Sequence, residues 1–281
     1  HTTIPNRTQV QIYFVEEEAN KMKKFVALLL AVLMVASLCA CGQKDTGSDL
    51  QTVTKGKLIM STNAEFAPYE YVADDGKGFQ GTGYEGIDIE IAYALAQKLG
   101  LELVVDNMDF DAALSAVQTG KSDMVAAGVT VTPDRLNAMS FTDSYANGVQ
   151  VVIVKEGSDI KSIDDLQGKK IGTQRGTTGF LYCSDDFGDD NVIGFDDGAT
   201  AVQNLKAGKI DCVVIDNVPA QEYVKANPGL TILDTEYANE DYAIGIAKDN
   251  TALQEALNKA LAELKADGTI QSIIDKYIPA K

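Results

Sequence analysis

A guanidinium group stands where an apolar strand of the sequence gives way to a helix. Within residues 126–135 the apolar run ends at Thr130, Thr132 can cap the following helix, and Pro133 suits its first position. Arg135 then falls in the first helical turn, beside backbone N–H groups that have no partner within the helix. A guanidinium there is suited to binding a carboxylate. The alternative for Arg135 is a surface position without a partner.

A turn rich in glycine and threonine offers a second anion site. Residues 172–179 read Gly-Thr-Gln-Arg-Gly-Thr-Thr-Gly and connect a predicted strand to a predicted helix. Turns of this composition present backbone amides and hydroxyl groups to an anion. The segment lacks the Gly-Lys-Ser/Thr ending of a nucleotide-binding loop, which argues against ATP. An ordinary turn without a ligand is the alternative.

A carboxylate completes the set. Asp216 ends the apolar run 212–215, and a carboxylate at the end of a buried strand needs a cation or hydrogen-bond donors. If it faces the guanidinium across a cleft, the two groups can bind both ends of a zwitterion. Phe66 and Phe110 are candidates to flank such a ligand. The alternatives are helix capping for Asp216 and core packing for the aromatic residues, and we expect core packing for Tyr71.

Composition excludes several kinds of function. The chain has 281 residues and a net charge of −17, which opposes binding to nucleic acid. Its single histidine is His1, so catalytic Ser-His or Cys-His pairs and zinc held by imidazole lack the residues they need. Binding, carboxylate chemistry or chemistry carried by a separate cofactor remains. Of these we expect binding, with no metal and no cofactor.

Alternating apolar strands and amphipathic helices predict an α/β fold with parallel sheets. The predicted strands are residues 57–61, 101–105, 124–131, 149–155, 170–173 and 212–215. The predicted helices are residues 86–100, 111–119, 178–184 and 199–207.

Two segments repeat at a distance of 88 residues. Ala113, Gly120, Lys121, Asp123 and Val125 correspond to Ala201, Gly208, Lys209, Asp211 and Val213. The match favours two lobes of one plan whose strand ends meet at a shared cleft. Convergence of any helix–turn–strand unit on this pattern is the alternative.

The N-terminal residues predict export. The basic start at Met22 and the short apolar run 25–38 indicate a signal peptide over residues 22–40, since a membrane span needs about 20 apolar residues. Residues 38–42 read Leu-Cys-Ala-Cys-Gly and resemble a bacterial lipobox, which implies a lipid on Cys41. A plain secretory signal is the alternative.

The flanks of this signal carry two further expectations. We expect residues 1–21 to come from an untranslated leader that has been read in frame. Glu16-Glu17-Glu18 can be encoded by a purine-rich ribosome-binding sequence just before Met22, the expected start of translation. A genuine extension is the alternative. The polar residues 41–55 predict a tether.

The ordered set of motifs resembles the family-3 solute-binding proteins of bacterial amino-acid ABC importers. The resemblance covers residues 57–278 and is carried by segments 66–69 (Phe-Ala-Pro-Tyr), 86–90 (Gly-Ile-Asp-Ile-Glu), 127–135, 176–179 and 213–216. It implies a two-lobed periplasmic-binding-protein-like type II fold with two hinge strands. We place lobe one at 51–147 and 243–281, lobe two at 148–242, and the hinge strands at 149–155 and 241–248.

The resemblance also implies roles for the site residues. The carbonyl of Gly128 and the amide and hydroxyl of Thr130 would contact the ligand. Arg135 and the Thr177-Thr178 turn would bind its α-carboxylate, and Asp216 its α-ammonium. The remaining ligand-binding residues are Phe66 and Phe110 beside the ligand side chain, with Asn63 and Gln174 at its far end.

We therefore expect a monomer that captures a free L-amino acid outside the membrane and delivers it to an ABC permease with a cytoplasmic ATPase. Asn63 replaces an aspartate that many relatives carry, which favours a polar, uncharged ligand side chain, while Glu65 leaves a basic one open. The alternatives are a dehydratase-type enzyme on the same fold and a detached sensory module. Cys183 and Cys212 are interpreted equally well as a disulfide of an exported protein or as buried thiols.

Overall fold

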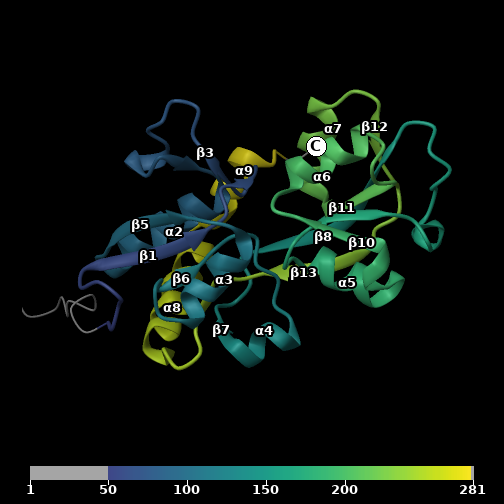
Figure 1. Cartoon of the computed structure of the whole chain (residues 1–281). Coiled ribbons are helices and arrows are strands. Elements are labelled where there is room, and N and C mark those ends of the chain that lie inside the picture. The colour runs from purple at the N-terminus through teal and green to yellow at the C-terminus, as the bar shows by residue number, and fades with distance from the viewer. Residues whose placement is uncertain (1–49, 280–281) are drawn as a thin grey trace, which may run out of the picture. The chain divides into compact units, whose positions relative to one another are not determined.

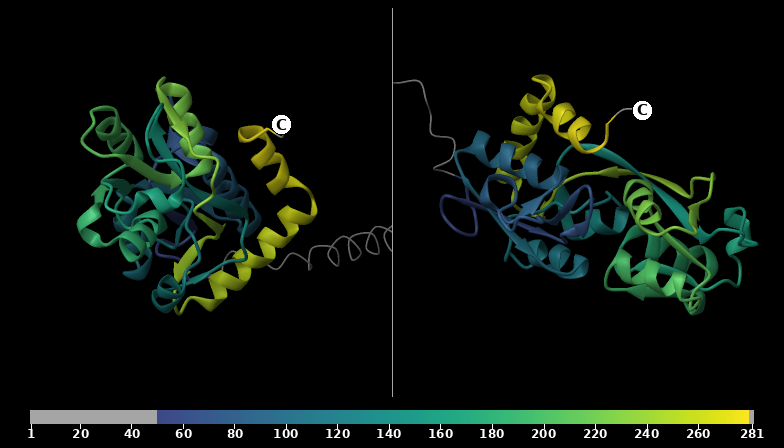
Figure 2. Two further views of the ribbon diagram at one scale, coloured as in Figure 1. Left: turned by 90° about the vertical axis from the view of Figure 1, so that its right-hand side faces the viewer. Right: turned by 90° about the horizontal axis from the view of Figure 1, so that it is seen from above.

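The computed structural model describes residues 50–279 (Figures 1 and 2). The predicted leader, the signal peptide, Cys41 and the first part of the tether lie outside the described residues. From Leu50 onward the chain is packed: Leu50 contacts the apolar core, and the amide of Val53 donates to Asp123 Oδ1 over 2.6 Å. No helix within residues 50–279 combines the length and apolar character that crossing a membrane requires.

The first sheet has the strand order β5-β1-β6-β14-β7. Its members are β1 (Lys57–Thr62), β5 (Glu102–Asn107), β6 (Met124–Val125), β7 (Met139–Phe141) and β14 (Gly245–Ala247). β5, β1 and β6 are parallel, whereas β14 runs antiparallel to both of its neighbours. A strand from the C-terminal part of the chain thus completes a sheet begun at the N-terminal part. We call the elements around this sheet lobe one.

Five α-helices and a small sheet surround the first sheet. The helices are α2 (Ile87–Leu99), α3 (Phe110–Gln118), α4 (Pro133–Ala138), α8 (Thr251–Ala266) and α9 (Thr269–Tyr277), and the small sheet is β2 (Glu65–Phe66), β3 (Glu70–Val72) and β4 (Tyr84–Glu85), with the 3-10 turn η1 (Phe79–Gly81). The fully buried face of α2, which carries Ile87, Ile91 and Leu95, packs with α8 and α9 into one apolar core. Figure 2 shows α8 and α9 as the yellow helices against this lobe.

The second sheet has the order β10-β9-β11-β8-β12, with β13 also paired to β8. Its strands are β8 (Ala146–Lys155), β9 (Ile171–Gln174), β10 (Val192–Phe195), β11 (Cys212–Asp216), β12 (Leu230–Ile232) and β13 (Ala238–Tyr242). The helices α5 (Thr178–Phe187), α6 (Gly198–Lys206) and α7 (Asn217–Ala226) pack on it, with the 3-10 turns η2 (Ile163–Leu166) and η3 (Asp189–Asn191). We call these elements lobe two.

The chain crosses between the two sheets twice. The crossings are residues 142–145, between β7 and β8, and residues 243–244, between β13 and β14. β8 and β13 run side by side in antiparallel register next to them (Figure 1). The predicted hinge segment 149–155 therefore lies inside lobe two, where its apolar residues are buried in the sheet, and the crossing itself comes a few residues earlier.

The prediction of parallel sheets is wrong in one respect. Both sheets are mixed, because β14 in lobe one and β8 in lobe two run against their neighbours. The predicted strand 124–131 is also shorter than expected, since only Met124–Val125 pairs as a strand. Beyond it the chain turns at Gly128, which has a φ of +55°, and only Thr130 forms a further bridge, to Tyr242. This irregular segment lies at the cleft.

The 88-residue repeat is a structural repeat. Helices α3 and α6 are each followed by a left-handed glycine, Gly120 and Gly208. Three residues after each glycine lies an aspartate. In both lobes its side chain accepts a hydrogen bond from a backbone amide at the neighbouring parallel strand. Asp123 Oδ2 accepts from the amide of Ile59 over 2.7 Å, and Asp211 Oδ2 accepts from the amide of Lys170 over 2.8 Å.

A buried carboxyl group joins three segments of lobe one beneath the cleft. Asp88 Oδ2, on α2, accepts from the amide of Gly128 over 2.9 Å and from the hydroxyl of Tyr145 over 2.7 Å. Burial raises the pKa of Asp88 to about 6, although these hydrogen bonds act in the opposite direction. Asp88 thus connects α2 to the turn at Gly128 and to the first crossing.

Replacing Asp88 by asparagine should remove a pH dependence of stability. Because the folded-state pKa of about 6 exceeds the unfolded value of 3.8, the contribution of Asp88 is present at low pH and is lost as the pH rises through 6. We expect Asp88→Asn to gain about 1–3 kcal/mol of unfolding free energy relative to the parent between pH 4 and pH 7. Urea unfolding at both pH values measures this. If the difference in unfolding free energy between variant and parent were the same at pH 4 and pH 7, the prediction would be wrong.

A second prediction concerns Gly86, which precedes α2. It has a φ of +127°, and a Cβ atom there would lie 2.1 Å from the carbonyl oxygen of Tyr69. Gly86→Ala should lower the unfolding free energy by on the order of 1–3 kcal/mol, since backbone must move. Gly100→Ala is the matched control, because Gly100 also has a positive φ but has open space around its Cα. Equal losses for the two variants in urea unfolding would refute this reasoning.

Candidate functional site

One pocket lies between the two sheets and is lined by residues of both lobes. Its cavity volume is about 20 Å³, which is room for about one water molecule in this arrangement. The ten ligand-binding residues predicted from the sequence all line it: Asn63, Phe66, Phe110, Gly128, Thr130, Arg135, Gln174, Thr177, Thr178 and Asp216. Five further residues complete the lining: Glu70, Ala127, Gln150, Val214 and Ile215.

The local sequence places Arg135 as predicted. Thr132 caps α4, and its hydroxyl accepts from the amide of Arg135 over 3.2 Å. The guanidinium donates from NH1 to the carbonyl of Thr130 over 2.8 Å and from NH2 to the carbonyl of Gly176 over 3.1 Å. It also lies over the ring of Phe110, 5.4 Å from the centroid. Two of its five N–H groups are used in this way, so the group is fixed with donors to spare.

Arg135 is buried, which makes its charge dependent on its surroundings. Its exposed fraction is 8%. Burial lowers the pKa of Arg135, and the negative charge of Glu240 is the first of several acidic influences that raise it again. Arginine stays charged under such conditions. The pocket therefore contains a permanent, oriented cation.

The glycine- and threonine-rich turn of lobe two faces this guanidinium. Thr177 caps α5: its hydroxyl accepts from the amide of Phe180 over 3.3 Å and donates to the carbonyl of Gln174 over 2.8 Å. The hydroxyls of Thr130 and Thr178 are 3.5 Å apart across the cleft. The first amides of α5 thus point toward the pocket, where an anion can accept from them.

Asp216 lies at the C-terminal end of β11 and is buried. Its Oδ2 accepts from Gln150 Nε2 over 2.9 Å, and its Oδ1 has no partner among the described residues. It precedes α7 but makes no side-chain capping bond to it, so the helix-capping alternative is not supported. Burial, and then the charge of Glu240, raise the pKa of Asp216 well above its usual value.

On the lobe-one side, Phe66 and Gly128 are in close contact. A Cβ atom at residue 128 would lie 2.8 Å from Cε1 of Phe66, so glycine there lets the ring reach the pocket. Phe66 also stacks on Tyr69, with ring centroids 5.6 Å apart. Phe66 therefore lines the site, whereas Tyr71 is half-buried away from it and donates to Glu85 Oε2 over 3.0 Å.

The far end of the pocket is formed by two amide side chains that bond to each other. Gln174 Nε2 donates to Asn63 Oδ1 over 2.8 Å and to the carbonyl of Asp196 over 3.0 Å. Asn63 Nδ2 donates to the carbonyl of Met108 over 3.0 Å. Both donors of Gln174 are used within the protein, and Asn63 Oδ1 already accepts from Gln174, which leaves Gln174 Oε1 and one N–H of Asn63 to contact a ligand.

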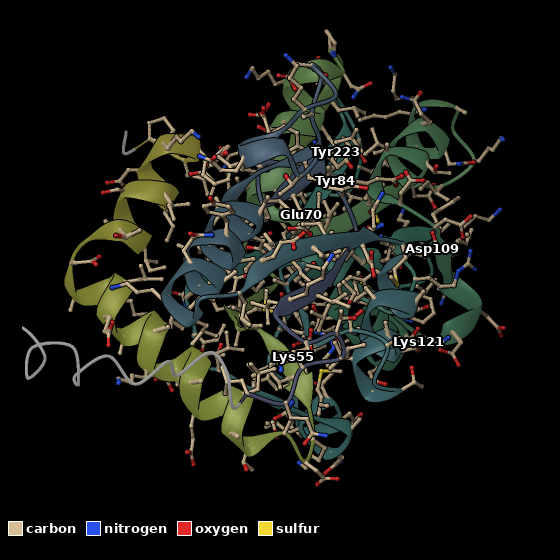
Figure 3. The ribbon with its side chains drawn as sticks, turned by 90° about the vertical axis from the view of Figure 1, so that its left-hand side faces the viewer. Lys55, Glu70, Tyr84, Asp109, Lys121 and Tyr223 are labelled. Carbon is tan, nitrogen blue, oxygen red and sulfur yellow. The ribbon has the colours of Figure 1, made fainter. Side chains whose placement is uncertain are left out.

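Three polar residues near the ligand site were missed by the sequence analysis. Glu70, labelled in Figure 3, is fully buried, lines the pocket and faces Asp88, and burial raises its pKa well above the usual value. Gln150 Nε2 donates hydrogen bonds to both Asp216 and Glu240. Gln150 could have been found as a single polar residue in an otherwise apolar strand. Glu240 lies among other polar residues and gives no such signal.

Other candidate chemistry is less well supported. Cys183 and Cys212 are both buried and are free thiols, which agrees with the buried-thiol alternative. Burial raises the pKa of Cys183 to about 12, so its thiolate is not available at neutral pH. Within residues 50–279, no three or more His, Cys, Asp or Glu side chains are grouped so as to hold a metal ion.

The comparisons with known proteins agree on one family. The sequence profile of the bacterial extracellular solute-binding proteins, family 3, matches residues 58–280. The chain is 33% identical over 266 residues to the arginine-binding extracellular protein ArtP of Bacillus subtilis, covering 91% of this chain and 98% of ArtP.

Solved structures of similar proteins agree with this. An ancestral arginine-binding protein bound to glutamine is 40% identical, with a TM-score of 0.74, covering 81% of this chain and all of that one. An ancestral arginine-binding protein bound to arginine is 41% identical, with a TM-score of 0.72, covering 79% and 98%. The predicted two-lobed type II fold is thereby confirmed. The chain belongs to the bacterial extracellular solute-binding proteins, family 3.

Proposed function

We propose that this protein captures a free L-amino acid in the pocket between its lobes and delivers it to an ABC permease with a cytoplasmic ATPase. The observation that carries the proposal is the pairing of a buried guanidinium from lobe one with a buried, half-satisfied carboxylate from lobe two in one pocket. The relatives named above are arginine-binding proteins, and one was determined with glutamine bound. Family membership also supports binding over the dehydratase alternative.

The pocket has one end for each charge of an amino acid. Arg135, the threonine hydroxyls and the first amides of α5 would receive the α-carboxylate, because all are hydrogen-bond donors. Asp216 and the carbonyl of Gly128 would receive the α-ammonium. The ammonium would supply the partner that Asp216 Oδ1 lacks within the described residues. Phe66 and Phe110 would flank the ligand side chain.

Ligand contacts with both lobes would stabilise the closed arrangement. Several side-chain bonds already join the lobes across the cleft, among them Arg135 to Gly176, Gln174 to Asn63, and the hydroxyl of Tyr223 to the carbonyl of Glu65 over 3.4 Å. A ligand that bonds to both lobes adds to this set only when the cleft is closed. Hinge motion at residues 142–145 and 243–244 would then control capture and release.

The far end of the pocket favours a ligand side chain that donates hydrogen bonds. Gln174 uses both of its amide donors within the protein and leaves its carbonyl oxygen, while Asn63 has one N–H left. Glu65 lies nearby, and burial followed by the charges of Asp197 and Asp109 raises its pKa. Glu65 is exposed and does not line the pocket, but it lies within the electrostatic reach of acids from both lobes, so cationic ligand side chains are expected beside uncharged amides.

The remaining parts of the proposal concern anchoring and organisation. We propose that lipidation of Cys41 anchors the protein to the membrane after removal of the signal peptide, and that the protein acts as a monomer. Residues 1–21 would be absent from the protein that the cell makes. Lobe one would comprise residues 51–147 and 243–281, and lobe two residues 148–242. Incorporation of radiolabelled palmitate, abolished by Cys41→Ala, would test the anchor.

Truncating Arg135 to alanine should weaken amino-acid binding strongly. The loss of a buried carboxylate partner is expected to cost about 2–5 kcal/mol, or roughly 30-fold to several thousand-fold in affinity. Titration calorimetry with L-arginine and L-glutamine would measure it, with thermal unfolding to confirm that the variant folds. The control is Arg175→Ala, since Arg175 is exposed and pairs with Asp196 outside the pocket. Undiminished binding by a folded Arg135→Ala protein would overturn the proposed site.

Replacing Gln174 by methionine should change the ranking of ligands. The variant keeps similar volume but loses the carbonyl acceptor, so L-arginine and L-glutamine should bind about tenfold more weakly. L-methionine should be affected less. Gln167→Met is the matched control, because Gln167 is exposed outside the pocket. A uniform loss across all three amino acids would show that Gln174 does not contact the ligand side chain.

A further inference from the structure

Two buried carboxyl groups share one amide group next to the proposed ammonium site. Glu240, on β13, and Asp216, on β11, are 5% and 8% exposed. Gln150 Nε2, on β8, donates to Asp216 Oδ2 and to Glu240 Oε2, each over 2.9 Å. The two hydrogens of this single NH₂ group are thereby divided between the two acids.

The pair is short of donors. Asp216 Oδ1 and Glu240 Oε1 are both buried without a hydrogen-bond partner among the described residues. The guanidinium of Arg135 donates to the backbone carbonyls of Thr130 and Gly176. Within residues 50–279, no ion pair joins it to either acid. Two buried carboxylates with one shared donor group are unfavourable, because each lacks hydration and they repel each other.

The other ionisable groups around the pair do not relieve this. Arg135 of α4 is the nearest cation, and its charge lowers the pKa of Asp216, but burial and Glu240 outweigh it. Tyr182 of α5 lies beside Glu240, and burial, followed by the charge of Glu240, raises the pKa of its hydroxyl. On the lobe-one side, Glu70 of β3 and Tyr69 are influenced by the charge of Asp216 in the same direction. Around Asp216, burial and Glu240 therefore favour the protonated carboxyl group, whereas the hydrogen bond from Gln150 and the charge of Arg135 favour the ionised one.

We propose that Glu240, which shares the amide of Gln150 with Asp216, keeps a proton on Asp216 in the unliganded protein, and that a captured amino acid displaces this proton. The inference rests on the proposed function, since it requires an α-ammonium group beside Asp216. The ammonium keeps its own three protons, and the displaced proton passes to solvent, so no covalent bond to carbon changes. Glu240 is a positioning residue, because it acts on the ligand through Gln150 and Asp216.

The linkage fixes the sign of the pH dependence. Binding that requires the loss of a proton becomes tighter as the pH rises toward the pKa of Asp216 in the unliganded protein, by up to about tenfold per pH unit for one proton. Above that pKa the affinity levels off. A cleft whose acids were both ionised before binding would give an affinity independent of pH in this range.

The experiment is titration calorimetry of the protein with L-arginine and L-glutamine from pH 5.5 to 7.5. Each pH is measured in two buffers of different ionisation enthalpy, which gives the number of protons released on binding. We expect a release approaching one proton at the lower pH values. Glu240→Gln removes one acid while keeping the size of the side chain. This variant should release fewer protons on binding the amino acid, and its affinity should depend less on pH. Glu236→Gln, an exposed neighbour in sequence, is the matched control and should behave as the parent.

The outcomes separate the inference from the function on which it rests. Binding with the same enthalpy in both buffers and no pH dependence would overturn the proton displacement and leave amino-acid capture intact. Proton release by Glu240→Gln equal to that of the parent would overturn the role of Glu240. Failure of the parent protein to bind any of the twenty amino acids would overturn the proposed function itself. Proton counting on the parent stands alone if Glu240→Gln does not fold.

Discussion

Arg135 is the one buried Lys or Arg within residues 50–279, and it lies among several buried carboxyl groups. Asp88, Glu70, Asp216 and Glu240 are all 8% exposed or less. A charge removed from water is tolerated only when other groups surround it with suitable donors and acceptors. Much of the architecture near the cleft supplies these groups: the cap of α4, the carbonyls at Thr130 and Gly176, and the strand that carries Gln150.

The mixed sheets are one consequence of this arrangement. In a parallel sheet all strand ends of one kind point the same way, which places Asp216 at the cleft. Gln150 reaches the same place because β8 runs in the opposite direction beside β11, with Gln150 in register with Asp216. Glu240 is delivered by β13 on the other side of β8. The antiparallel strands thus bring to the site both the amide group that donates to Asp216 and a second buried acid.

Much of the site could be predicted from the sequence, and the reason is local. Thr132 and Pro133 fix the start of α4, so the place of Arg135 follows from capping rules, and all ten proposed ligand-binding residues line the pocket. Strand direction could not be predicted, because β14 and β8 owe their orientation to contacts distant in sequence. Glu240 was missed for the same reason, since its partner Gln150 is 90 residues away. Two acids that share one amide leave no trace in local sequence patterns.

The place of β14 in the first sheet has a consequence for the order of assembly. β14 lies between β6 and β7, yet more than 100 residues separate it from them in the chain, and all of lobe two is synthesised in between. Lobe two is continuous in the chain, whereas the sheet of lobe one stays divided until β14 has been made. Contacts of such long range form slowly. The lobe that contains the N-terminal part of the described chain is therefore finished only after the whole of lobe two has been made.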